Sequence, residues 1–183
     1  MFLLKTARLG NPIIRSATEP VSQEELKSAS LQNLIDGMIQ TMRDADGVGI
    51  AAPQVHVPKR IIVIEVSPDN PRYPNRQGVP LTVIVNPEIT SLAEDYHEDW
   101  EGCLSVPDFR AKVPRSTSLQ VSGLDRNGEL LDIHAEDFFA RVIQHEVDHL
   151  EGKVFLDRLP NLKTLTYLRE YQKYWQSPTS EQL

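Results

Sequence analysis

The stretch QHEVDH at residues 144–149 is the part of the sequence that decides the architecture. It places His145 and His149 four residues apart, and two helical side chains at this spacing are rotated by only about 40° from each other. Both imidazoles can therefore reach one metal ion, with Glu146 placed to exchange protons with a reacting water. Two histidines alone are more often incidental, but the added glutamate and the apolar face of this helix favour a metal site.

Capping residues and apolar residues at helical spacing predict three helices. The central one covers residues 138–150, with Asp137 as its cap and Gly152 as its C-terminal signal. The first helix is expected from the capping box of Ser22 and Glu25 to the Asp46-Gly47 pair, with Leu31, Leu34, Ile35, Met38 and Met42 at helical spacing. The last helix is expected past Pro160, with Leu162, Leu165, Leu168 and Tyr171 at helical spacing.

The remaining apolar segments predict strands that do not alternate with helices in a βαβ order. Buried strands are expected at residues 60–66 and 81–85, and a hairpin at residues 119–125 and 129–134 around Asn127-Gly128. The fold class is therefore α+β, with mostly antiparallel sheets around a central helix that carries HEVDH and with a C-terminal helix. Residues 67–80 contain four prolines and are expected to form a surface loop.

Length and composition favour a globular protein with a single domain over residues 1–183, in which residues 177–183 form a frayed tail. The net charge of −7 argues against broad nonspecific binding to DNA or to an acidic membrane. No apolar run approaches the roughly 20 residues needed to span a bilayer. A single cysteine is compatible with a reducing compartment, and we expect a cytoplasmic protein.

A catalytic site of this kind needs a third protein ligand, and the search for it limits the class of enzyme. The metzincin pattern ends in a histidine where this chain has Phe155, and a thermolysin-like ligand at Glu170 would lie beyond the interruption at Pro160. Cys103 is the best remaining candidate, because a thiolate suits Fe(II) or Zn(II) beside two imidazoles. The other histidines are expected to be solvated or structural, His56 and His97 in loops and His134 at a strand end.

Three segments, in order, resemble the signature motifs of peptide deformylases: GVGIAAPQ at residues 47–54, EGCLS at 101–105 and HEVDH at 145–149. The similarity runs from about residue 6 to residue 159. It implies a metal-dependent hydrolase that removes the N-formyl group from the N-terminal formyl-methionine of newly made polypeptides and releases formate.

The resemblance also implies the roles of individual residues. Cys103, His145 and His149 would hold one divalent metal ion, which in this family is Fe²⁺ with Zn²⁺, Ni²⁺ or Co²⁺ as substitutes, and the sequence does not choose among them. Glu146 would act as general base and then as general acid. The side-chain amide of Gln54 and the backbone N–H of Leu104 would hold the developing oxyanion.

Other positions match family residues that contact the peptide. Its backbone would run along Val48 and Gly49, Arg110 would contact it, and Val142 and His145 would form walls of the methionine pocket. Two features depart from the pattern. Arg141 lies where many members have an aliphatic residue, which leaves the preference beyond methionine open, and the loop at residues 67–80 is a surface insertion or a cover near the site.

The sequence leaves further alternatives open. A zinc endopeptidase would use Glu170 in place of Cys103, and an inactive binding protein is disfavoured because every acting residue is present. We expect Glu101 to be structural, as an ion-pair partner of an arginine such as Arg115. Residues 153–173 have five cations against two anions, which suits either a transient ribosome contact or a solvated helix face.

Overall fold

The computed structural model describes residues 3–72 and 76–176, so the expected tail at residues 177–183 and residues 73–75 of the proline-rich loop lie outside the described ranges. The helices are η1 (Pro12–Arg15), α1 (Gln23–Leu26), α2 (Ala29–Asp44), η2 (Ala52–Val55), α3 (Asp137–Leu150), η3 (Phe155–Arg158) and α4 (Leu168–Tyr174). None of them combines the length and apolarity of a membrane-spanning helix within these described ranges.

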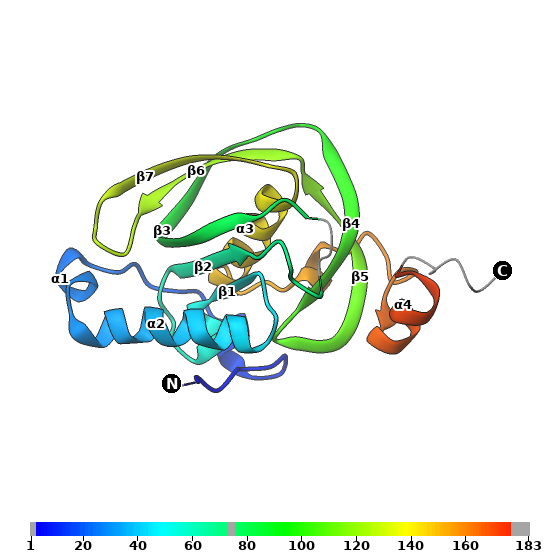
Figure 1. Ribbon diagram of the computed structural model, residues 1–183, viewed down its shortest axis with the longest axis horizontal. Coiled ribbons are helices and arrows are strands. Elements are labelled where there is room, and N and C mark those ends of the chain that lie inside the picture. The colour runs from blue at the N-terminus through cyan, green and yellow to red at the C-terminus, as the bar shows by residue number, and fades with distance from the viewer. Residues whose placement is uncertain (1–2, 73–75, 177–183) are drawn as a thin grey trace.

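The strands form two antiparallel sheets, which confirms the predicted α+β class. One sheet has the order β1-β2-β3-β6-β7, and the other has the order β4-β5-β8. Helix α3 packs against strands of both sheets and lies at the centre of the molecule (Figure 1). The strands are β1 (Gly49–Ala51), β2 (Ile61–Val66), β3 (Val79–Leu92), β4 (Tyr96–Cys103), β5 (Val106–Ser116), β6 (Ser118–Leu124), β7 (Leu130–Glu136) and β8 (Thr166–Tyr167).

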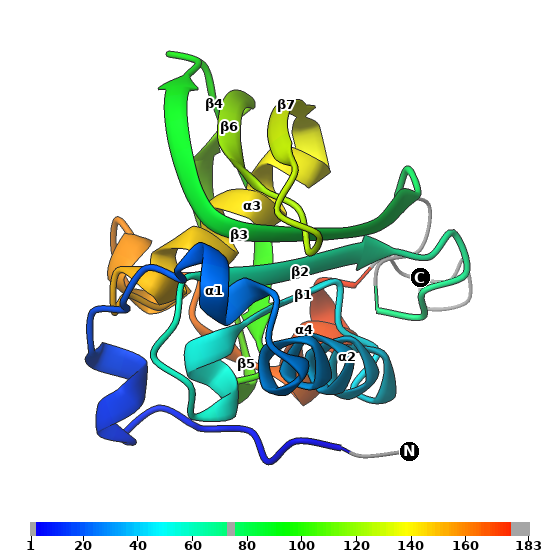
Figure 2. The ribbon, with the colours of Figure 1, turned by 90° about the vertical axis from the view of Figure 1, so that its left-hand side faces the viewer.

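The first sheet is covered on both faces, which explains the continuous apolar run of β2. Ile62 and Ile64 belong to the core cluster beneath α3, whereas Ile61 and Val63 belong to the cluster beneath α2. Successive side chains of a strand point to opposite faces, so each face of the sheet receives its own helix. Figure 2 shows α2 and α3 on the two sides of β1, β2 and β3.

The termini of α3 explain how the HEVDH segment is held. Its N-cap is Glu136 rather than the predicted Asp137, which is instead the first helical residue and has a φ of 49°. Gly152 has a φ of 68°, as expected for a glycine that ends a helix. The predicted extent of this helix is thereby confirmed to within one residue at its start.

Two other helix predictions need correction. The first helix is divided at Lys27 and Ser28, because the Ser28 hydroxyl accepts a hydrogen bond from the backbone N–H of Leu31 and starts α2 separately from α1. The last helix begins only at Leu168, because the preceding Thr166 pairs with β5 as part of β8. The capping box at the start of α1 is confirmed.

The long hairpin of β4 and β5 was not predicted, whereas the β6–β7 hairpin was and is confirmed. Strand β4 has the sequence YHEDWEGC, in which apolar and polar residues do not alternate. Its own sequence therefore does not indicate a strand, and its pairing with β5 defines it. His97 therefore lies in a strand rather than in the expected loop. Strand β3 also extends beyond the predicted residues 81–85 at both ends.

Substitution of Gly152 by alanine is expected to destabilise the protein more than the same change at Gly10. Both glycines have a positive φ, which costs an alanine about 1–2 kcal/mol. A Cβ at Gly152 would also lie 2.7 Å from the backbone oxygen of Arg15, whereas one at Gly10 would meet nothing within 4 Å. Urea unfolding should show a loss larger by about 1 kcal/mol or more for Gly152→Ala. Equal losses would contradict this account of the end of α3.

Candidate active site

Two elements bring the candidate metal ligands together. Cys103 is the last residue of β4, and His145 and His149 lie one turn apart on the buried side of α3. One ligand atom from each of the three residues lies within 4.8 Å of the others. The structure thus places the cysteine beside the two histidines, as the sequence suggested, and these residues could hold a metal ion.

The surroundings of Cys103 favour its thiolate form. Burial alone would raise the pKa of the thiol, but the charge of His149 and a hydrogen bond with His145 hold it well below its usual range. The backbone N–H of Ser105 also donates to Sγ at 3.3 Å, and Nε2 of His149 lies 3.2 Å from it. A thiolate is the form in which cysteine binds a metal.

Glu146 is the second buried group that points to a missing partner. Among the described residues, Oε2 of Glu146 and Nδ1 of His149 are the buried side-chain nitrogen and oxygen atoms that have no hydrogen-bond partner. Burial raises the pKa of Glu146 to about 7, although the imidazoles of His145 and His149 act in the opposite direction. A carboxyl group with this pKa can both accept and return a proton near neutral pH. The donor set and the unsatisfied carboxylate fit a site for a divalent metal and water.

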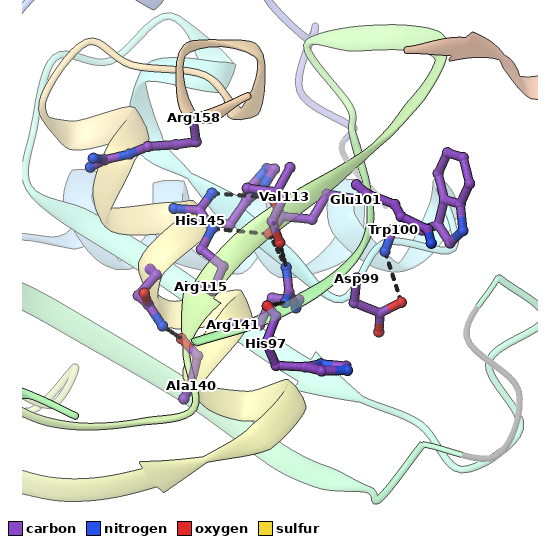
Figure 3. A network of polar contacts seen from close by, with 12 residues as sticks. His97, Asp99, Trp100, Glu101, Val113, Arg115, Ala140, Arg141, His145 and Arg158 are labelled. Carbon is purple, nitrogen blue, oxygen red and sulfur yellow. Dashed lines mark hydrogen bonds and ion pairs between the residues drawn. The ribbon is translucent and has the colours of Figure 1, made fainter. Parts of the chain in front are cut away.

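Glu101 orients the first histidine (Figure 3). Its Oε2 lies 2.8 Å from Nδ1 of His145, which leaves Nε2 of that ring for a ligand. Its Oε1 accepts hydrogen bonds from Arg115 at 2.9 Å and from Arg141 at 2.8 Å. Although burial opposes ionisation, the charges of Arg115 and His145 hold the pKa of Glu101 far below its usual range. The expected structural pair with Arg115 is confirmed, and the contacts to Arg141 and His145 are additional.

A second buried carboxylate ties α3 to the same network. Asp148 lies between the two histidines in sequence and accepts hydrogen bonds from Arg115 at 2.5 Å and from Arg158 at 2.5 Å. Arg115 of β5 therefore joins β4, through Glu101, to α3. Sequence reasoning missed this network, although an aspartate on the buried side of the HEVDH helix was a signal that it needs a cationic partner.

Most of the predicted substrate-binding residues border one cavity of about 40 Å³ beside the ligand cluster. It is lined by the predicted residues Val48, Gly49, Gln54, Leu104, Val142 and Glu146 together with two of the candidate ligands, Cys103 and His145. Arg110 is placed differently: its guanidinium packs against Gly102, and Nη1 donates to the backbone oxygen of Phe109 at 2.7 Å. It therefore lies beside the EGCLS motif without bordering this cavity.

The glycine motif brings backbone close to the reacting groups. A Cβ on Gly49 would lie 2.8 Å from Cδ of Glu146, so only glycine leaves the carboxylate in place. Gln54 is buried, and its Oε1 accepts a hydrogen bond from the backbone N–H of Ala51 at 2.8 Å. That bond fixes the orientation of the amide, whose Nε2 donates to Oγ of Ser105 at 3.2 Å.

The proline-rich loop, which the sequence left as a surface insertion or a cover, borders the site, and so does Trp100, which the sequence did not assign to it. Arg72 of the proline-rich loop lines the cavity and donates to the backbone oxygen of Ala45, and Arg76 forms an ion pair with Asp99 of β4. The described ends of this loop therefore favour a cover near the site over a surface insertion. Trp100 also lines the cavity, and its ring contacts those of Tyr171 and Trp175 near the C-terminal helix.

Comparison with known proteins identifies similar chains over nearly the whole length. The family model described as polypeptide deformylase matches residues 3–165. A peptide deformylase from Leptospira biflexa is 43% identical over 167 residues, covering 91% of this chain and 93% of that protein. Peptide deformylase 2 from a Nostoc species is 44% identical over 172 residues, covering 93% and 94%. The Met-Ala-Ser-bound crystal structure of class I type b peptide deformylase from Acinetobacter baumannii has a TM-score of 0.82 at 42% identity, covering 86% of this chain and 98% of that one.

Substitution of Glu101 by glutamine is expected to weaken metal binding by about 10–100-fold, because His145 loses the carboxylate that orients it. The change should also destabilise the fold by about 3 kcal/mol or more, since Arg115 and Arg141 stay buried without their shared countercharge. Chelator competition and urea unfolding measure the two effects.

The matched control is Glu65→Gln, which removes a partly exposed partner of Arg43. It should cost less than about 1 kcal/mol and leave metal affinity unchanged. Wild-type metal affinity in Glu101→Gln would contradict the orienting role of Glu101.

Proposed function

This chain belongs to the polypeptide deformylase family and is a peptide deformylase, and we propose that the residues gathered around Cys103 carry out its reaction. The enzyme removes the N-formyl group from nascent peptides. The observation that carries the proposal is the cluster of Cys103, His145 and His149 beside a small cavity that Cys103, His145 and the unsatisfied Glu146 line. The bond to be cleaved is the amide between the formyl carbon and the methionine nitrogen.

Cys103, His145 and His149 are the proposed ligands of one divalent metal ion. Their soft thiolate and two imidazoles suit Fe²⁺, Zn²⁺, Ni²⁺ or Co²⁺, and we assign Fe²⁺ from the family resemblance. When bound, such an ion would supply Lewis acidity and lower the pKa of a coordinated water towards about 7. The protein contributes an ionised thiol, a histidine fixed by Glu101 and a cavity at the open side of the ligands.

Glu146 is the proposed proton carrier. Its carboxylate takes a proton from the water that attacks the formyl carbon, and it returns that proton to the methionine nitrogen as the C–N bond breaks. The products are formate and a peptide with a free N-terminal methionine. A pKa of about 7 suits both halves of this cycle at neutral pH.

The formyl oxygen gains negative charge as its carbon becomes tetrahedral, and two neutral donors can meet it. We assign this role to Nε2 of Gln54 and the backbone N–H of Leu104. The hydrogen bond from Ala51 to Oε1 of Gln54 holds the amide in its orientation before the substrate binds. Loss of one such donor typically lowers turnover by about 10²–10³-fold.

The substrate backbone is proposed to lie along Val48 and Gly49. Strand β1 is an edge strand of its sheet, paired with β2 on one side, so its other edge can pair with an extended peptide. Val142 and His145 then border the side chain of the first residue, while Arg110 acts further along the peptide. The Acinetobacter baumannii structure was solved with the peptide Met-Ala-Ser bound, which is chemically the product of such a reaction.

The endopeptidase alternative finds no support in the ligand geometry. Within residues 3–72 and 76–176, the cluster able to hold a metal contains Cys103 and not Glu170. Glu170 lies in the first turn of α4, which packs against β5. A Cys103→Ala variant should therefore lose its metal, whereas an endopeptidase of the thermolysin type would keep it.

We further propose that residues 1–183 act as one catalytic domain in the cytoplasm, with transient ribosome contact by residues 153–173. The support for that contact is the excess of cations, of which Lys163, Arg169 and Lys173 are exposed. Charge reversal at these three positions should weaken co-sedimentation with ribosomes at low salt. Unchanged co-sedimentation would leave the segment as a solvated helix face.

Replacement of Glu146 by alanine is expected to lower formate release from formyl-Met-Ala-Ser by about 10²–10⁴-fold, because the proton carrier is lost. The assay uses anaerobic protein loaded with Fe²⁺, and metal content is measured alongside turnover. The control is Glu151→Ala, which removes an exposed partner of Arg60 at the end of the same helix and should preserve turnover. Formate release at the wild-type rate by metal-loaded Glu146→Ala would refute the assigned role.

A further inference from the structure

A second and much larger cavity adjoins the active-site cavity at the start of α3. The active-site cavity has about 40 Å³ and the second about 520 Å³. The second cavity is bordered by the beginning of β3, by β4, β5 and β7 and by the first turns of α3. Among the described residues, Phe138 and Arg141 are the two that line both cavities, so they form the wall between them.

Arg141 is fixed in this wall by hydrogen bonds to three partners. Its Nη1 donates to Oε1 of Glu101 and to the backbone oxygen of Val113, both at 2.8 Å, and Nη2 donates to the backbone oxygen of His97 at 2.5 Å. The side chain is only 6% exposed. Figure 3 shows the guanidinium between His97 and Glu101. It cannot swing aside without leaving buried acceptors unpaired, so this part of the wall is rigid.

Phe138 completes the wall from the preceding turn of α3, where residues three apart share one helix face. The guanidinium of Arg76 lies over its ring, 4.9 Å from the centroid. Arg76 in turn forms an ion pair with Asp99 of β4. Arg76 of the proline-rich loop and Asp99 of β4 thus hold Phe138 in place from the side of the larger cavity.

We propose that Arg141, together with Phe138, sets the depth of the pocket that receives the side chain of the substrate's first residue. This inference rests on the proposed function, because that pocket is the one bordered by Val142 and His145. The small cavity has only about 40 Å³, which leaves little room for a side chain longer than that of methionine. The wall, rather than the packed core, is what stops a longer chain, since a much larger space lies directly behind it.

The wall limits the length of the substrate side chain and does not select for its charge. The carboxylate of Glu101 neutralises the guanidinium of Arg141, so an uncharged side chain meets no unbalanced charge at the end of the pocket. Beyond the wall, the larger cavity is bordered by charged or polar residues such as Arg76, His97 and Asp99 and also by the apolar residues Val79, Pro80 and Phe139. A longer apolar chain is therefore excluded by contact, and it should be accepted once the contact is removed.

The test uses peptides formyl-Xaa-Ala-Ser in which Xaa is homocysteine alkylated at sulfur by methyl, ethyl, propyl or butyl. The methyl member is methionine itself, and each step adds one methylene. Each kcat/KM is divided by that of the same variant on the methyl peptide, which cancels any general loss of metal or turnover. For the wild type we expect losses of about 10–200-fold for each methylene that no longer fits. Arg141→Ala should process the propyl peptide within about 3-fold of the methyl peptide.

Two further variants separate the wall from other effects of Arg141. Arg141→Met keeps a long side chain without the guanidinium and should retain the wild-type length limit despite lower overall turnover. Arg158→Ala removes another arginine of the buried network, one that borders neither cavity, and should also retain the limit. If Arg141→Ala does not fold, Phe138→Ala opens the same wall and should show the same shift.

The outcomes distinguish this inference from the proposed function. An Arg141→Ala enzyme that cleaves the methyl peptide but keeps the wild-type length limit overturns the inference. Absence of formate release from metal-loaded wild type overturns the proposed function instead. In that case calorimetric binding of the unformylated peptides tests the wall directly: a longer limit in Arg141→Ala supports it, and an unchanged limit refutes it.

Discussion

The buried carboxylate of Glu101 is the constraint on which the rest of the structure depends. A charge this deeply buried is tolerated only when it is paired and hydrogen-bonded, and Glu101 meets Arg115, Arg141 and His145. These partners come from β5 and α3, while Glu101 itself lies on β4 beside Cys103. One carboxylate therefore aligns the strand that carries the thiol with the helix that carries the imidazoles. The geometry of the candidate metal site follows from this alignment.

Glu101 and Glu146 are both buried at the site, but their different surroundings give the two carboxyl groups different pKa values and different roles. Cations around Glu101 keep its pKa low, so it remains an anion that orients a histidine. Oε2 of Glu146 has no hydrogen-bond partner among the described residues, and burial raises the pKa of this carboxyl group to about 7. One carboxylate is thus a fixed structural charge and the other an exchangeable proton site. Gly49 preserves this division, because any side chain there would displace the Glu146 carboxylate.

Features fixed by local sequence were predictable. The capping box of α1, the glycine after α3 and the Asn127-Gly128 hairpin all depend on residues close in the chain, and the three motifs brought the site residues into view. Strands β4 and β5 were missed because β4 is polar and is defined by its partner strand. The contacts of Arg141 with Glu101, Val113 and His97 also join distant segments, so its place in the wall between two cavities could not be inferred from periodicity.

The central claim is that Cys103, His145 and His149 together form one metal site in the orientation that Glu101 imposes. X-ray absorption spectroscopy of the zinc-loaded protein measures this most directly, because scattering distances identify the ligand atoms. The account predicts one sulfur at about 2.3 Å and two imidazole nitrogens at about 2.0–2.1 Å. A first coordination sphere without sulfur, or with a single imidazole, would contradict it.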